Sequence, residues 1–487
     1  MVLIMLDSRH FIKRISIFVS IISIYLLVYL PVITHNYGFA DDYSVTFTAH
    51  HHILSLLYMV VSSGRPVYAL FNFVFSLTSD IADFRWVRLA SVLGIATLAQ
   101  IIATFFIEET DLPRSLSISA ALLIGLMPAF QVYASWAVCA GYPWAAAIAV
   151  FSFCVLHRNQ YGGWQVSLTS FILLTLAMMI YQPAAMMYWV IAAAVWVAND
   201  RPLPSCNRIV RTVSIMMAAL LADFISEKIL THFVFHHYYT LSRTALTTNF
   251  MQKISWFISS PMRDSLNFIS ITASRTVSVI FGAFIFIGFC LFIFRSNNSR
   301  IMKAMLSFSL LPMAYLPNLI VDENWASYRT QSALSSLLIL YAAVALFAWL
   351  RQFRMLRLAP AIALVAILSS TGVARNNVIT EFVNPQTKEL KLVSRYLKMH
   401  LDNLNGAKQI YIVPSHWQES LAPVVRYDEF GMPSSADQWV PKGMVWLLLK
   451  SEHEPTASKL STAKVGPLSA APKGSTVIDL SQALGSR

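Results

Sequence analysis

The sequence predicts an all-α polytopic membrane bundle followed by a small α/β region. Hydrophobic residues make up 56% of its 487 residues and charged residues only 12%, against roughly 25% charged in soluble domains. One soluble core cannot bury that much apolar surface, and disorder requires low hydrophobicity. Long apolar runs fill residues 11–373, whereas residues 374–487 are more polar. We therefore divide the chain at residue 373.

The number of spans follows from the length of the apolar runs, since a helix needs about 20 apolar residues to cross a bilayer. About eleven runs qualify, three of them short. They cover residues 11–33, 87–107, 116–136, 143–156, 164–180, 184–197, 210–230, 276–294, 301–321, 331–350 and 358–373.

Orientation follows from the basic residues. Arg9 and Lys13 precede a first apolar run that is too long for a signal peptide and lacks a cleavage site, so we expect an uncleaved helix with its N-terminus inside. Alternate loops are basic, as the positive-inside rule requires, and this explains the net charge of +12. The loop with Glu108 and Glu109 is the exception. An odd number of spans places the C-terminus outside, together with loops 34–86 and 231–275. We expect a multi-pass membrane protein.

Local patterns predict the elements outside the spans. The pattern of apolar residues predicts two short amphipathic helices in the membrane interface, at 53–61 and 67–77. In the C-terminal region, apolar residues at helical spacing predict a helix over 388–404, and strands are expected at 409–413 and 476–480. Ser, Ala, Lys and Pro dominate 454–474, which predicts a loose linker and a flexible tail.

The most informative polar feature is the pair Asp41-Asp42, within HNYGFADDYSVTF directly after the first span. Carboxylates beside hydrocarbon are costly unless they are solvated or functional. Such a pair can act as general base on a hydroxyl, or supply hard oxygen ligands to a divalent cation such as Mg²⁺ or Mn²⁺. The alternative is a solvated loop start that fixes the end of the first helix.

Two outer arginines are candidate phosphate ligands. Arg65 lies in Ser-Gly-Arg-Pro, and Arg329 ends the densest polar cluster between two apolar runs. Tyr328 suits phosphate or sugar binding, Trp325 suits stacking on a sugar ring, and ordinary interfacial anchoring is the alternative. The set of candidate donor-binding residues is Arg65, Asp322, Glu323, Trp325, Tyr328 and Arg329, with weaker candidates at His52, Arg243 and Arg263.

Residues 11–373 resemble the GT-C type of membrane glycosyltransferase, in which an acidic motif occupies the first external loop and short interfacial helices follow it. The stretch ADDYSV, followed by SSGRPVYALFNFVFSL at 62–77, is most similar to bacterial serotype-converting glucosyltransferases. The resemblance implies transfer of a sugar, glucose by analogy, from a polyprenyl-phosphate carrier to a glycan or lipid acceptor, such as O-antigen. It implies Asp41 or Asp42 as the general base, separate proteins that supply and flip the donor, and a multi-pass protein of the bacterial inner membrane.

Two other classes remain open. An O-antigen polymerase or ligase would place its chemistry at arginines of loop 231–275, without need of Asp41. A transporter or flippase would carry charges deep within several spans, whereas the mid-span charges are essentially those from Asp223 to Lys228. Phosphate-loop, dinucleotide and zinc-protease motifs are absent, so we expect no nucleotide cofactor. No basic, aromatic-rich face suggests nucleic acid.

Overall fold

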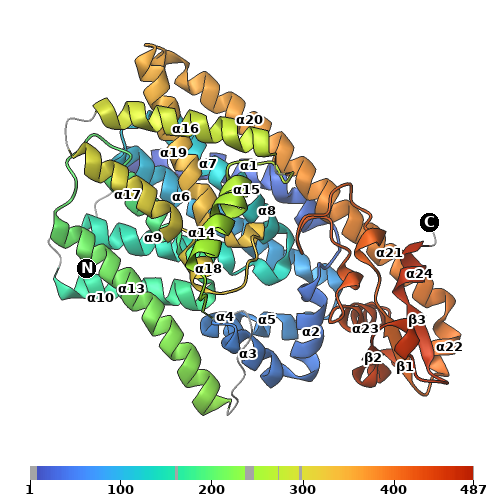
Figure 1. The fold of residues 1–487 in the computed structure, drawn as a ribbon. Helices are drawn as coiled ribbons and strands as arrows, with labels where there is room; N and C mark the ends of the chain where they lie inside the picture. The colour runs from blue at the N-terminus through green and yellow to red at the C-terminus, as the bar shows by residue number, and fades with distance from the viewer. Residues whose placement is uncertain (1–7, 160–162, 236–245, 273, 296–298, 486–487) are drawn as a thin grey trace.

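The computed structural model describes residues 8–159, 163–235, 246–272, 274–295 and 299–485. Helices dominate these residues, and the three named strands lie near the C-terminal end of the chain (Figure 1). The predicted all-α bundle is therefore confirmed in its general character.

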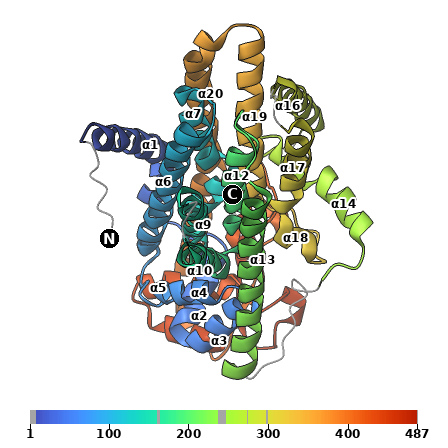
Figure 2. The same ribbon diagram turned by 90° about the vertical axis from the view of Figure 1, so that its left-hand side faces the viewer.

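Seven helices among the described residues are long and apolar enough to cross a membrane. Each coincides with a predicted span, and Figure 2 shows two of them, α13 and α19, running along the length of the bundle. The seven are α1 (Ser8–Thr34), α6 (Phe84–Glu109), α9 (Tyr142–Arg158), α13 (Cys206–Ile229), α16 (Arg275–Arg295), α19 (Ser332–Gln352) and α20 (Ala359–Val378).

The other four predicted spans are short or broken. The pair α7 and α8 bends by 53°, and α10 has only 17 residues. Two of the broken runs, 116–136 and 301–321, resume at a helix with proline in its first turn, where the missing N–H and the ring disfavour continuation. The total of eleven spans stays a prediction. The elements are α7 (Arg114–Leu126), α8 (Pro128–Ser135), α10 (Trp164–Ile180), α11 (Gln182–Ala185), α12 (Met187–Trp196), α17 (Arg300–Met313) and α18 (Leu316–Ile320).

The basic loops that we predicted to share one side do meet at one end of the bundle, here called the distal end. Arg158 pairs with Glu108, and Arg201 pairs with Glu109 at 2.9 Å. Arg351 reaches Asp200 at 3.3 Å. The exceptional acidic loop thus lies among the basic ones and neutralises part of their charge.

The opposite, proximal end carries the short helices and the C-terminal region. The predicted helix 53–61 is confirmed, whereas 67–77 is divided at Asn72 into two short helices. Helix α2 (Asp41–His51) packs against α23 (Pro441–Ser451) (Figure 1). The short elements are α2 (Asp41–His51), α3 (Ile53–Ser62), α4 (Pro66–Phe71), α5 (Phe73–Ser76), α14 (Phe250–Ser259) and α15 (Pro261–Ser265).

The C-terminal region holds a small parallel sheet in the order β2-β1-β3. Helix α20 leads into it through a π-helical turn at Ile379–Val383. Both predicted strands are confirmed, whereas the predicted helix 388–404 breaks at His400. The elements are α21 (Asn384–Met399), α22 (Leu401–Asn405), β1 (Ile410–Val413), α23 (Pro441–Ser451), β2 (Lys464–Val465), β3 (Thr476–Asp479) and α24 (Leu480–Gly485).

The predicted loose linker 454–474 is wrong. It forms a 3₁₀ helix at Pro455–Thr462 and then strand β2, which pairs with β1. The reason is burial: Leu460 is fully enclosed, and the Thr456 hydroxyl bonds to Asn405. A few well-placed apolar and hydroxyl side chains order a segment whose average composition is that of a linker.

The link from α1 to α2 enters the bundle interior and is held by the fully buried Arg88 of α6. Its guanidinium donates to the carbonyls of Val32 at 2.6 Å, Tyr37 at 2.7 Å and His35 at 3.0 Å. These carbonyls end α1 and follow it, so they lack partners within a helix. Arg88 therefore closes α1 and fixes the start of the next segment.

We expect Arg88→Met to lower the free energy of unfolding by on the order of 3 kcal/mol, since three buried carbonyls lose their donor at ~1 kcal/mol or more each. Thermal unfolding of the purified protein in detergent measures the effect. Arg85→Met is the matched control, because Arg85 is exposed on the same helix. Equal melting temperatures for the two variants would contradict this role.

Candidate active site

The two carboxylates of the Asp pair have different environments. Asp42 is fully buried, and its oxygens accept from the backbone N–H groups of Phe39 at 2.9 Å, Val138 at 2.8 Å and Ala137 at 3.3 Å. Burial raises the pKa of Asp42 to about 7, although these N–H groups and the charge of Arg88 lower it. Asp42 thus ties the start of α2 to the segment that follows α8.

Asp41 lies at the surface, half-buried, next to the C-terminal region. Its Oδ1 accepts from the indole N–H of Trp439 at 2.7 Å. The preceding Ala40 has φ 42°, a left-handed conformation that costs a non-glycine residue about 1 kcal/mol or more. The N–H of Ala40 donates to Ser434 Oγ at 2.8 Å, so the C-terminal region also holds this conformation in place.

A further carboxyl, Asp437, belongs to the same neighbourhood. Burial raises its pKa to about 6, and the charges of Asp41 and Asp428 add to the rise while Arg329 opposes it. Acidic groups from α2 and from the C-terminal region therefore gather at one place.

Arg65 stands at the N-terminus of α4 and faces two tyrosines. Its Nη1 donates to the Tyr142 hydroxyl at 3.0 Å, and its guanidinium lies 4.8 Å from the centroid of the Tyr181 ring. Its buried Nε has no hydrogen-bond partner, and none of the ion pairs found among the described residues includes Arg65. A buried donor without a partner is costly, and an anion would satisfy it.

Arg329 lies close enough to Arg65 for the two cations to repel each other. It pairs with Asp428 at 2.6 Å and with Glu429 at 3.4 Å, and its guanidinium lies 5.0 Å from the centroid of the Trp136 ring. The Trp136 indole N–H is buried and unbonded. Two arginines and two partnerless N–H donors therefore lie around the tyrosines.

The side chains of the other candidates from the polar cluster make their contacts elsewhere. Tyr328 is buried, and its hydroxyl donates to the Ile271 carbonyl at 2.8 Å. Asp322 and Glu323 are exposed, and their carbonyls accept from Lys253 Nζ. Trp325 packs edge-on against Tyr427 with ring centroids 5.8 Å apart. These contacts hold the segment before α19 in place.

The three weaker candidates differ in placement. His52 stands between α2 and α3, with its ring tilted against that of His51. Arg263 pairs at 3.0 Å with the buried Asp264, which also binds Arg426 of the C-terminal region at 2.9 Å. Arg243 lies outside the described residues.

The residues do not fit a divalent cation held by the Asp pair. Both oxygens of Asp42 face N–H donors, which a cation would repel, and Asp41 bonds to an indole. Across the ranges that the structure describes, no group of three His, Cys, Asp or Glu side chains could hold a metal ion. We derive no step through a metal.

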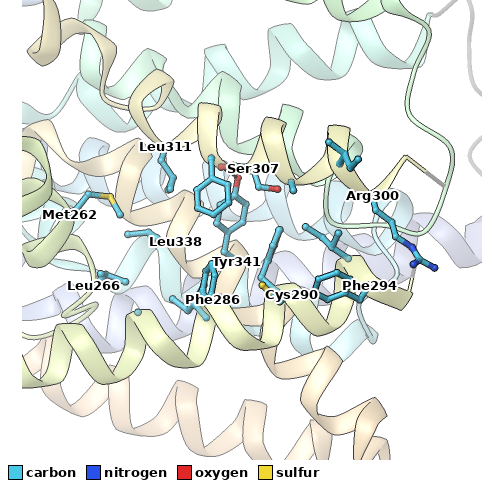
Figure 3. Close-up of a pocket in the computed structure, with 17 residues that line it drawn as sticks. Met262, Leu266, Phe286, Cys290, Phe294, Arg300, Ser307, Leu311, Leu338 and Tyr341 are labelled. Atoms are coloured by element: carbon cyan, nitrogen blue, oxygen red, sulfur yellow. Dashed lines mark hydrogen bonds between the residues drawn. The ribbon is translucent and has the colours of Figure 1, made fainter. Parts of the chain in front are cut away.

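An apolar cavity of about 340 Å³ lies between α16, α17 and α19 (Figure 3). Phe286, Cys290 and Phe294 line one wall, and Met262 and Leu266 close the end near α15 (Figure 3). Its lining is almost wholly apolar, and it runs along helices long enough to span a membrane. It suits a hydrocarbon chain.

Sequence reasoning missed Trp136, Tyr142, Tyr181 and Asp437. The two tyrosines stack with ring centroids 3.8 Å apart, although 39 positions separate them (181 − 142). In the sequence, each looks like an interfacial aromatic at the end of an apolar run. No local pattern distinguishes them from such anchors.

A comparison of the chain with protein-family models finds no match, and no curated protein matches it. The resemblance to membrane glycosyltransferases thus stays a prediction from the two short motifs and the architecture.

We expect Asp42→Asn to lower the melting temperature in detergent, because a carboxamide offers one acceptor oxygen to three N–H donors and leaves at least one unbonded, at about 1–3 kcal/mol. Asp41→Asn, the neighbouring control, keeps an oxygen for Trp439 and should melt like the unchanged protein. Equal destabilisation by the two substitutions would show that Asp42 has no special structural role.

Proposed function

We propose that the protein transfers a sugar from a polyprenyl-phosphate carrier to a hydroxyl of a surface glycan, on the outer face of the bacterial inner membrane. Asp41 is the general base. The observation that carries the proposal is that the charges of Asp41, Arg65 and Arg329, from three distant parts of the chain, all act on Tyr142. Tyr142 lies at one end of a bundle of long apolar helices.

Arg65 supports the phosphate half of the proposal. A planar guanidinium binds phosphate oxygens through parallel N–H bonds, and Arg65 keeps a buried Nε without a partner beside Tyr142. Arg329 adds a second positive charge, although Asp428 and Glu429 already neutralise it in part. Arg65 is therefore the principal phosphate ligand.

Asp41 supports the acceptor half. Of the two carboxylates it is the one at the surface, whereas both oxygens of Asp42 accept backbone N–H bonds. In the reaction, the bond between the sugar C1 and the phosphate oxygen breaks, and a bond from C1 to the acceptor oxygen forms. The acceptor proton passes to Asp41, and polyprenyl phosphate leaves with its negative charge facing Arg65.

The carrier also needs a place for its hydrocarbon tail. The cavity between α16 and α17 ends at Met262 and Leu266 (Figure 3), and Arg263 follows Met262 directly in the chain. A prenyl chain in this cavity stays within the membrane while its phosphate lies at the proximal end. Glucose is the sugar we infer from the sequence resemblance alone.

We expect Asp41→Asn to lower the transfer rate by about 10²–10⁴-fold, because a general base is lost while the fold is kept. The assay follows transfer of radiolabelled glucose from polyprenyl-phosphate-glucose to endogenous glycan in membrane vesicles. Asp402→Asn, on an exposed helix of the C-terminal region, is the control. Full activity of the Asp41→Asn variant would exclude Asp41 as the base.

We expect Arg65→Gln to raise the KM for the donor about 10–100-fold, equivalent to losing about 1.5–3 kcal/mol of charged hydrogen bonding. The KM for the acceptor should stay the same. Arg85→Gln, an exposed arginine of α6, is the control. If Arg263→Gln abolishes activity and Arg65→Gln does not, the chemistry lies at the 231–275 segment, as in a polymerase or ligase.

A further inference from the structure

Trp439 is a large aromatic side chain fixed beside Asp41 but left open to solvent. Its indole N–H bonds to Asp41 Oδ1 at 2.7 Å, yet 59% of the residue is exposed. A buried Trp normally satisfies its N–H while hiding its ring. Here the N–H is satisfied by the proposed base, and the ring is still accessible.

The backbone around Trp439 is well anchored. The N–H of Val440 donates to the Asp437 carbonyl at 3.0 Å, and Val440 itself is fully buried. Pro441 then begins α23, which packs against α2. The ring is thus presented by a rigid turn next to the helix that carries Asp41, and an immobile aromatic surface binds a ligand at low entropic cost.

The charges around the ring select the type of ligand. The charges of Asp41 and Asp428 both act on Asp437, while Arg329, which is paired with Asp428, opposes them. An acidic ligand would meet repulsion at this place, whereas a neutral sugar offers hydroxyl donors to the carboxylates and an apolar C–H face to the indole. Aromatic surface with a few convergent polar groups is typical of small-molecule sites.

We propose that Trp439 is the acceptor-binding platform, which stacks on an uncharged pyranose ring and sets its hydroxyl against Asp41. This inference rests on the proposed function for the identity of the reaction, but not for the binding itself. It assigns acceptor choice to the C-terminal region and donor binding to Arg65 in the bundle.

The first test measures binding without donor. The purified full-length protein in detergent is titrated by calorimetry with neutral tetrasaccharides of hexose and N-acetylhexosamine units, and with the same compounds carrying one hexuronic acid. We expect saturable binding of a neutral compound, at least tenfold weaker binding by Trp439→Ala, and recovery to within about threefold by Trp439→Phe, which restores an aromatic face. The hexuronic acid compounds should bind at least tenfold more weakly.

Trp417→Ala is the matched control, because Trp417 is also partly exposed in the C-terminal region, at 37%. Its binding should equal that of the unchanged protein, and all variants should share one melting temperature. The proposal is overturned if the unchanged protein binds no neutral compound, if Trp439→Ala binds as well as it does, or if the acidic compounds bind equally tightly.

A second measurement separates this inference from the proposed function. With polyprenyl-phosphate-glucose as donor, Trp439→Ala should raise the acceptor KM at least tenfold and leave the donor KM unchanged. A protein that binds the neutral glycan through Trp439 but transfers no sugar would refute the proposed function and keep the platform. A protein that transfers sugar equally well with Trp439→Ala would refute the platform and keep the function.

Discussion

The geometry of the proximal end depends on two ionisable side chains, Arg88 and Asp42, which are buried next to the link from α1 to α2. Backbone groups within an apolar bundle have no water to bind, so the chain itself must satisfy them. Arg88 supplies donors to three carbonyls of the link, and Asp42 supplies acceptors to three N–H groups from two segments. Non-helical backbone can therefore lie inside the bundle. Asp41, which follows this backbone, is held in a fixed position.

The C-terminal region completes the same arrangement through separate anchors. Glu429 accepts hydrogen bonds from the N–H groups of Tyr328 and Arg329 at 2.8 and 2.9 Å. Asp264 of α15 accepts a hydrogen bond from the guanidinium of Arg426. Ser434, itself bound to Gln386 at 2.6 Å, holds Ala40. Three contacts of different chemistry therefore fix the C-terminal region to the bundle. The site is composite, with one part in the bundle and one in the region after it.

Composition and run length were sufficient to predict the seven long helices, because the length of each apolar run alone indicates a spanning helix. The broken runs were harder, since proline within an apolar run is compatible with either a span or a bend. At the site, adjacency in sequence was misleading: Asp41 and Asp42 are neighbours, but successive helical residues point about 100° apart. The acidic partners of Arg329 lie about 100 positions away, which no local pattern reveals.

The dependence on Ser434 and Trp439 has a consequence for biosynthesis. Both residues emerge from the ribosome after every long helix of the bundle. A nascent chain that has already inserted its helices still lacks the partner that holds Ala40 in its left-handed conformation. The backbone before Asp41 therefore takes its final conformation late, after the last hundred or so residues have folded onto the bundle.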